Sequence, residues 1–205
     1  MQEFAEACAA WLSERPEAVC GQAARELRAA LLQSLAPATR VDVPEPRALA
    51  YLQPLLGSSD RSDLAEPLAA LAPDLIWFEP GEGEMKRHLG GCNCVTQLVG
   101  PADRAASTGI RFGTFLIAPN ALYPRHVHGA EELYLIIAGS GRWSYDGEPY
   151  VRHGPGEFAH SRSWQPHAIR TGDEALLMAW IWMGDISLNS YRMEADLPDP
   201  ERPAS

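Results

Sequence analysis

The sequence predicts a mainly β protein, a jelly-roll barrel that carries an α-helical extension at its N-terminus. Near residue 73 the chain changes from Ala- and Leu-rich helical patterning to short β-rich runs divided by Gly, Pro and Asn. Many short antiparallel strands are typical of a jelly roll. We assign 1–72 to the helical extension, 73–195 to the β-barrel and 196–205 to a polar, proline-rich tail that we expect to be disordered. A chain of 205 residues, 46% of them hydrophobic, suits one such domain with a sizeable core.

Four helices are expected in the extension, over residues 2–14, 17–35, 45–56 and 63–72. Leu27, Leu31 and Leu35 recur at four-residue spacing, as one apolar face of an amphipathic helix requires. Pro67 falls in the first turn of the last expected helix, where proline is tolerated. We expect these helices to cover the barrel, with a homodimer contact as the alternative. A separate partner-binding module is disfavoured because so short a segment holds little core of its own.

Eight strands are expected in the second part, near residues 74–79, 93–99, 110–118, 132–138, 141–146, 156–160, 166–171 and 175–183. Glycine-containing turn sequences separate several of these strands: a Ser and Gly run around residue 139, AspGly at 146 and ThrGlyAsp at 171. We therefore expect a turn at each of these three places.

Composition argues against several classes of function. A formal net charge of −10 disfavours a general nucleic-acid binder, which needs clustered Lys and Arg to contact phosphates. No apolar run is long enough to span a membrane. The N-terminus lacks a basic start followed by an apolar stretch, so it does not resemble an export signal and we expect a cytoplasmic protein.

The four cysteines do not form the paired CxxC units of a zinc knuckle. Cys8 and Cys20 lie in helical sequence, where we expect them to be buried in the core. Cys92 and Cys94, in GGCNC, are interpreted as two buried free thiols, with a metal or redox role as the less favoured alternative.

The segment HVHGAEELY carries the strongest candidate site. In a β-strand, side chains two residues apart point to the same face, so His126 and His128 point the same way. Glu132 and Tyr134 keep that parity, and the Gly and Ala between the two pairs can bend the chain so that the second pair closes on the first. His167, in QPHAIRT, can supply a fourth ligand from a distant strand.

Imidazole nitrogens and a carboxylate oxygen suit one divalent transition metal, namely Zn, Fe, Mn, Co or Ni. Three His and one Glu leave one or two coordination positions open, which suggests chemistry rather than a structural site. The alternative is that His126 and His128 are surface strand residues and Glu132 is a solvated charge. The accompanying Tyr134 and Gly139 favour the metal site.

The segment from residue 126 to 139 resembles the first cupin motif: HxH, three residues, Glu, six residues, Gly. Of the second cupin motif, only Gly156 and His167 stand in the expected places. The departures from usual cupin residues touch no ligand position and are Asn120, Arg162, Trp164 and Thr171. Within the cupins, Tyr134, the tyrosine in YPRHVH and the segment QPHAIRT look like the cupin-type dimethylsulfoniopropionate lyases, over about residues 110 to 185.

This resemblance implies β-elimination on a small zwitterionic sulfonium carboxylate, giving dimethyl sulfide and acrylate. The implied metal binds the substrate carboxylate, and a base removes the proton next to it. Tyr134 is the first candidate base, since an adjacent dication favours the phenolate of a group whose free pKa is about 10. An alternative is that Tyr134 ligates the metal while substrate is absent.

Tyr123 is the second candidate, as base or hydrogen-bond donor. It has the opposite strand parity to His126, so it reaches the site only if Pro124 bends the chain. Ordinary packing in the barrel is the alternative for both tyrosines.

Aromatic side chains are expected to bind the sulfonium group by cation–π interaction. Trp182 is the first candidate, followed by Trp180 and then Trp164. In LLMAWIWM, Trp180 and Trp182 share one strand face with Met178, and core packing is the alternative, slightly favoured for Trp180.

A hydrogen-bonded structural role is expected for His160, and the alternative is that it replaces a metal ligand or acts as an acid in the pocket. His153 and His88 are expected to be exposed. Another mononuclear metal cupin, a dioxygenase or isomerase, would use the same ligands, but it needs no phenol beside its metal. A non-enzymatic ligand-binding cupin is disfavoured by the intact ligand set.

Overall fold

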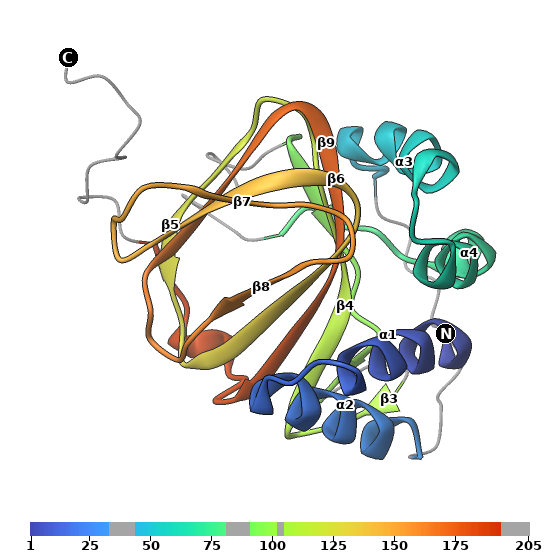
Figure 1. The fold of residues 1–205 in the computed structure, drawn as a ribbon, viewed down its shortest axis with the longest axis vertical. Coiled ribbons are helices and arrows are strands. Elements are labelled where there is room, and N and C mark those ends of the chain that lie inside the picture. Colours follow the sequence, from blue (N-terminus) through green and yellow to red (C-terminus); the bar gives the residue numbers. More distant parts are fainter. Residues whose placement is uncertain (33–43, 81–90, 102–104, 194–205) are drawn as a thin grey trace.

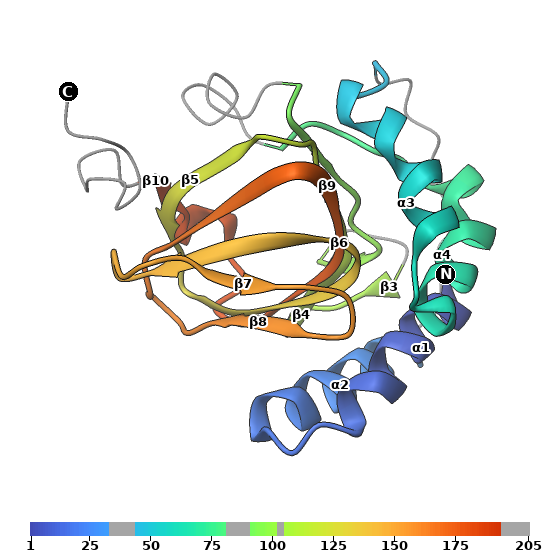
Figure 2. The ribbon, with the colours of Figure 1, turned by 45° about the horizontal axis from the view of Figure 1, so that its top comes forward.

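The computed structural model describes residues 1–32, 44–80, 91–101 and 105–193. A strongly curved β-sheet forms most of the molecule, and the N-terminal helices lie together against one side of it (Figure 1). The same arrangement is seen when the molecule is turned, with α1 and α2 along one part of that side and α3 and α4 along another (Figure 2). The predicted mainly β class with a helical N-terminal part is therefore confirmed.

The helical part follows the sequence prediction closely. Its elements are α1 (Gln2–Ser13), α2 (Ala18–Leu31), the 3-10 helix η1 (Arg47–Tyr51), α3 (Leu52–Ser58), α4 (Ser62–Leu71) and the short η2 (Ala72–Asp74). Leu27 and Leu31 lie on the buried face of α2, whereas Leu35 is outside the described residues. Because α4 begins at Ser62, Pro67 lies inside the helix rather than in its first turn.

Within its described residues the structure has ten strands where the sequence predicts eight, and two of them, β6 and β9, are longer than any that were expected. They are β1 (Asn93–Val95), β2 (Val99–Gly100), β3 (Ala105–Ala106), β4 (Ile110–Ile117), β5 (Leu122–Val127), β6 (Ala130–Tyr145), β7 (Val151–His153), β8 (Phe158–Ser161), β9 (His167–Gly184) and β10 (Arg192–Met193), with the 3-10 helix η3 (Leu188–Ser190) before β10. The strand expected at 74–79 is reduced to one isolated bridge, from Phe78 to Val95.

Two of the three expected turns are wrong, because the chain continues through them as strand. β6 runs through residue 139 with register shifts between Ile136 and Ala138 and between Gly139 and Gly141. The first shift has the pattern of a β-bulge, because β6 advances by two residues while β9 advances by one. The second is an irregularity in β9, and neither shift reverses β6. β9 likewise continues through residue 171. The AspGly turn is confirmed, with positive φ at Asp146 and at the glycine that follows it.

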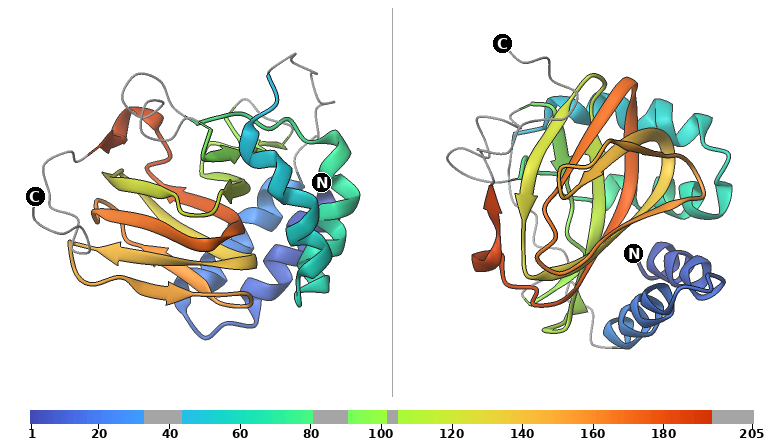
Figure 3. Two further views of the ribbon diagram at one scale, coloured as in Figure 1. Left: turned by 90° about the horizontal axis from the view of Figure 1, so that it is seen from above. Right: turned by 60° about the vertical axis from the view of Figure 1, so that its left-hand side comes forward.

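The sheet is organised around β6 and β9, which pair along almost their whole length. The first residues of β9 pair with β5 and its later residues with β4, while β6 also pairs with β7 and β8. β6 and β9 therefore pass through both halves of the curved sheet, as the side views illustrate (Figure 3). Among the described strands, no pairing joins the ends of the sheet, so it does not close into a complete barrel.

The two faces of β6 and β9 pack into two different core clusters. Leu133 and Leu135 of β6, with Leu177 of β9, belong to one core cluster with the buried residues of the helices. The alternate residues Tyr134 and Met178 belong to a second cluster on the inner face of the sheet. The helices thus cover the outer face, which leaves the inner face for the candidate site.

Buried cysteines and histidines mostly follow expectation, with two corrections. Cys8, Cys20 and Cys94 are buried free thiols, but Cys92 is exposed. His153 is half-buried rather than exposed, because its ring packs edge-on against Trp143 at 5.3 Å between centroids. His88 and the tail at 196–205 lie outside the described residues. Within the described part of the chain, no helix is long and apolar enough to cross a bilayer.

Candidate metal centre and pocket

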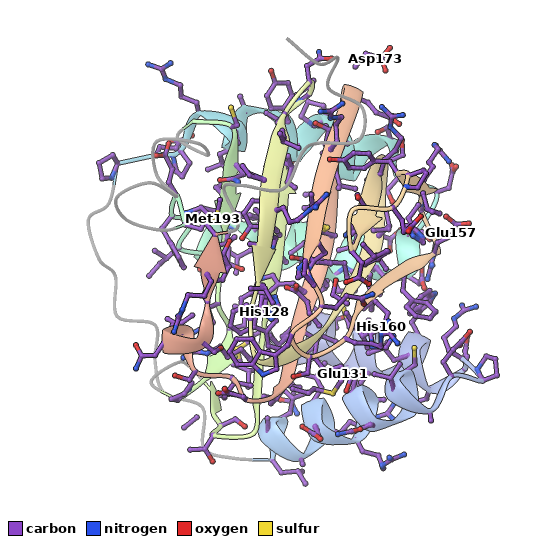
Figure 4. The ribbon with its side chains drawn as sticks, turned by 90° about the vertical axis from the view of Figure 1, so that its left-hand side faces the viewer. His128, Glu131, Glu157, His160, Asp173 and Met193 are labelled. Carbon is purple, nitrogen blue, oxygen red and sulfur yellow. The ribbon has the colours of Figure 1, made fainter. Side chains whose placement is uncertain are left out.

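Three strands, with the short connection between β5 and β6 that carries His128, bring the four predicted metal-binding side chains to one place. β5 and β9 pair so that His126 stands opposite His167, and Glu132 enters from β6. One ligand atom from each of His126, His128, Glu132 and His167 lies within 4.8 Å of the others. All four side chains are buried, which excludes the alternative of surface histidines and a solvated charge. Figure 4 shows His128 amid the strands.

Each imidazole is held by its Nδ1 atom against a backbone carbonyl oxygen. The three contacts are His126 to Pro124 at 2.8 Å, His128 to Ala130 at 3.0 Å and His167 to Gln165 at 2.8 Å. A carbonyl oxygen only accepts hydrogen bonds, so Nδ1 carries the proton and Nε2 is left as the metal-binding atom. Such contacts are the usual means by which proteins orient metal-ligating histidines.

Glu132 lies at the centre of the group and uses both carboxylate oxygens. Its Oε2 atom is 3.0 Å from Nε2 of His128 and 3.1 Å from Nε2 of His167. Its Oε1 atom accepts a hydrogen bond from the indole nitrogen of Trp182 at 2.6 Å. Burial alone would raise the pKa of Glu132, but the two imidazoles outweigh it and hold that pKa well below its usual range.

The donor set fits a divalent metal ion. Burial, and then the neighbouring His167 and His128, hold the pKa of His126 well below its usual value, so this imidazole is neutral, as a ligand must be. Three imidazole nitrogens and one carboxylate oxygen form a set that binds Zn, Fe, Mn, Co or Ni. The buried group could therefore hold a metal, and nothing in it selects one of these five.

A cavity of about 410 Å³ opens onto this group from the inner face of the sheet. Apolar and aromatic side chains supply most of its wall, and Glu132 joins it to the metal-binding residues. Its lining residues are Phe78, Pro80, Val95, Gln97, Arg111, Phe115, Tyr123, Glu132, Tyr134, Trp180, Trp182, Leu188 and Tyr191.

Both predicted tyrosines reach this pocket. Tyr134 follows Glu132 by two residues on β6, and both side chains line the pocket. Tyr123 comes to the same side through a register shift between Tyr123 and His126, at the place where Pro124 was expected to bend the strand. Burial raises the pKa of both phenols, and the nearby Glu132 charge adds to the increase.

Comparison with known proteins places the chain in a family. The model of the dimethylsulfoniopropionate lyase family matches residues 19–178. The chain is also 31% identical, over 157 residues, to dimethylsulfoniopropionate lyase DddQ of Ruegeria pomeroyi, an alignment that covers 73% of this chain and 75% of that protein. The chain belongs to the dimethylsulfoniopropionate lyase family. Membership of this family makes it a carbon–sulfur lyase.

Solved structures of dimethylsulfoniopropionate lyases share the fold. One, from a study of the lyases RdDddP and RnDddQII, aligns with a TM-score of 0.71 at 23% identity over 94% of this chain and 96% of that one. The structure of DddQ from Ruegeria pomeroyi aligns with a TM-score of 0.63 at 24% identity over 91% and 95%. The mainly β fold with a helical N-terminal part is therefore shared with these two solved lyases.

The three tryptophans singled out in the sequence occupy different places in this lyase. Trp182 and Trp180 line the pocket, and Trp182 also packs against His128 with ring centroids 4.3 Å apart. The indole nitrogen of Trp180 donates to the carbonyl oxygen of Thr96 at 3.2 Å. Trp164 is 54% exposed and is not among the residues that line the pocket, so the structure does not bring it together with the other two tryptophans.

His160 stands apart from the metal-binding group. Its Nε2 atom is 2.8 Å from a carboxylate oxygen of Glu131, the neighbour of Glu132 on the opposite face of β6. Figure 4 shows this pair side by side. The contact corresponds to the hydrogen-bonded structural histidine that was one of the two expectations.

Tyr191 is a pocket residue that the sequence analysis missed. Its hydroxyl lies 3.1 Å from the hydroxyl of Tyr123, and its ring stacks on His126 at 5.2 Å between centroids. It belongs to the segment that carries β10 to pair with β5 beside His126. No motif surrounds Tyr191 in the sequence, and only this distant strand pairing brings it to the site.

Proposed function

We propose that this lyase cleaves dimethylsulfoniopropionate to dimethyl sulfide and acrylate by β-elimination, with Tyr134 as the base. The observation that carries the proposal is the position of Tyr134, which is buried, close enough to Glu132 to feel its charge, and part of the pocket wall. Family membership supports the substrate and the reaction class. The place of Tyr134 between the pocket and the ligand group supports its role.

The four converging residues His126, His128, Glu132 and His167 would hold one divalent transition metal. When bound, the metal would supply positive charge beside the substrate carboxylate and the phenol, which stabilises the negative charge that develops on both. The neighbouring carbonyl contacts keep the imidazoles in one orientation, so the site is organised before substrate arrives.

Tyr134 acts as the phenolate, after losing its own proton to solvent, and takes the proton from the carbon next to the substrate carboxylate. The electron pair of that C–H bond forms the new carbon–carbon double bond, and the pair of the C–S bond leaves with sulfur as neutral dimethyl sulfide. Acrylate remains, and the proton stays on the phenol oxygen until it is lost to solvent. Because burial and the Glu132 charge hold the pKa of Tyr134 well above 10, the phenol is neutral until positive charge enters the site.

Tyr123 is the second candidate for the base, and its hydroxyl is paired with that of Tyr191. In our proposal the pair orients the substrate carboxylate by hydrogen bonding while Tyr134 moves the proton. Tyr123 packs edge-on against Phe115 at 5.3 Å between centroids, which limits the movement of its ring.

The sulfonium end of the substrate would lie against the aromatic wall of the pocket. Trp180, Trp182 and Phe78 present aromatic surface there, and a cation against such a surface gains about 0.5–2 kcal/mol. The small zwitterion is thus held at one end by the metal-binding group and at the other by the aromatic wall.

A cytoplasmic location and a homodimer remain predictions of the sequence.

The test is to purify the protein, measure its metal content and add dimethylsulfoniopropionate. We expect dimethyl sulfide, detected by gas chromatography, and acrylate, detected by liquid chromatography, in equal amounts. Removal of the metal by a chelator should abolish both products, and readdition should restore them. A fully metal-loaded protein that forms neither product would overturn the proposal and favour another metal cupin activity.

A further inference from the structure

We propose that Trp182 is a positioning residue for the metal centre, whose indole N–H orients Glu132, in addition to forming the pocket wall. The inference rests on the metal-binding part of the proposed function but not on the identity of the substrate. It starts from the 2.6 Å hydrogen bond between Nε1 of Trp182 and Oε1 of Glu132.

The bond joins two side chains whose backbones are themselves held together. Glu132 and Trp182 are direct partners in the register of β6 and β9. Both are buried, with exposed fractions of 2% and 6%. A hydrogen bond to a buried carboxylate is short and strong because the acceptor is charged and water is excluded. The orientation of Glu132 is therefore set by the sheet and by this indole together.

The two carboxylate oxygens of Glu132 have different partners. Oε1 is taken by Trp182, whereas Oε2 faces the Nε2 atoms of His128 and His167 and is the oxygen offered to a metal. Without the N–H, Oε1 loses its strong donor, and the carboxylate gains freedom to rotate about its last torsion. We expect a weaker metal site and a changed set of coordinating oxygens.

Trp182 acts on a second ligand through its ring. The indole packs against the imidazole of His128 at 4.3 Å between centroids, and Nδ1 of that histidine is held by the Ala130 carbonyl. A phenylalanine at position 182 would keep an aromatic face against His128 and against the pocket while removing the donor. The two contributions of Trp182 can thus be separated.

Trp180 provides a matched control two residues away on the same strand. It also lines the pocket, but its indole N–H donates to the carbonyl of Thr96 rather than to a metal-binding residue. Replacing either tryptophan by phenylalanine removes the same atoms and one hydrogen bond from β9. Only the change at position 182 removes a hydrogen bond to a ligand.

The experiment is to measure the dissociation constant for Zn²⁺ of the metal-free protein without substrate, by competition with a chelating indicator. We expect Trp182→Phe to weaken binding by about 10–100-fold, the usual cost of losing an outer partner of a metal ligand. Trp180→Phe should stay within about twofold of the wild type, since it leaves every ligand and its partners intact. The visible spectrum of the Co²⁺-loaded protein should change only in Trp182→Phe, because it reports the coordinating atoms.

Equal Zn²⁺ affinity and an unchanged Co²⁺ spectrum in Trp182→Phe would overturn the inference and leave Trp182 as pocket wall alone. Equal losses in both variants would also overturn it, since they would indicate general loosening of β9. If Trp182→Phe does not fold, benzothienylalanine at position 182 keeps both fused rings and lacks only the N–H. A lyase assay separates the two proposals, because normal metal binding without dimethyl sulfide would contradict the proposed function only.

Discussion

Replacement of Gly139 by alanine tests the bulged path of β6 that the structure shows in place of a turn. The glycine has a φ of +71°, a conformation that costs an L-residue about 1–2 kcal/mol. A Cβ atom would lie 1.8 Å from the carbonyl oxygen of Ala175 and 3.0 Å from its carbonyl carbon. These are backbone atoms of the paired strand β9, so the clash is relieved only by moving the strands apart. We expect a total loss of about 3–5 kcal/mol in the free energy of unfolding.

Two other glycines separate the backbone strain from the clash. Gly184 has a φ of +78° with nothing within 4 Å of a Cβ, so its alanine variant should lose only about 1–2 kcal/mol. Gly172 has neither a positive φ nor a close neighbour, and its alanine variant should stay within about 0.5 kcal/mol of the wild type. Urea unfolding of the three metal-free variants gives these differences. Equal losses for the Gly139 and Gly184 variants would refute the close approach of β6 and β9.

Three further predictions concern the site. The stability of the metal-free protein should fall as the pH drops below about 6.5. His126 has a lowered pKa in the folded protein, so below that pH it binds a proton only in the unfolded chain. Below about 4.5 the lowered pKa of Glu132 adds a second loss of stability in the same direction. Melting temperatures across this range check the sign, and a flat profile would contradict it. Tyr191→Phe keeps the ring that stacks on His126 but removes the hydroxyl that is hydrogen-bonded to Tyr123. The kcat should therefore fall by about 3–10-fold while the metal content stays unchanged. A loss of metal as large as the loss of activity would make Tyr191 a structural residue. Trp180→Leu should raise KM by about 2–30-fold, the equivalent of one cation–π contact, with less effect on kcat, whereas an unchanged KM would assign Trp180 to packing.

Most of the group that could hold a metal was predicted from the sequence because its geometry is largely local. His126 and His128, and then Glu132 and Tyr134, alternate with the period of a strand, so their common face follows from the backbone alone. His167 was expected to come from a distant strand, and the pairing of β5 with β9 puts it opposite His126. The helices of the N-terminal part could also be predicted, since the spacing of their apolar residues is a local pattern.

The features that could not be predicted from the sequence depend on pairing between strands that are far apart in the chain. A Gly with positive φ suits a turn and an irregular place in a strand equally well, and only the pairing with β9 keeps Gly139 within β6. Tyr191 enters the pocket because β10 pairs with β5, which no pattern near residue 191 indicates. The strand face of Trp182 was predicted correctly, but the partner of its indole N–H depends on the register between β6 and β9.

The central claim is that Tyr134 removes the proton, and the most direct measurement is the rate of dimethyl sulfide release by Tyr134→Phe at full metal content. The variant should bind metal as the wild type does, because the four ligand residues are intact. We predict that its rate falls by about 100–10,000-fold, the usual contribution of a positioned base. A metal-loaded Tyr134→Phe protein that releases dimethyl sulfide within about threefold of the wild-type rate would contradict the account, since general base catalysis is worth far more.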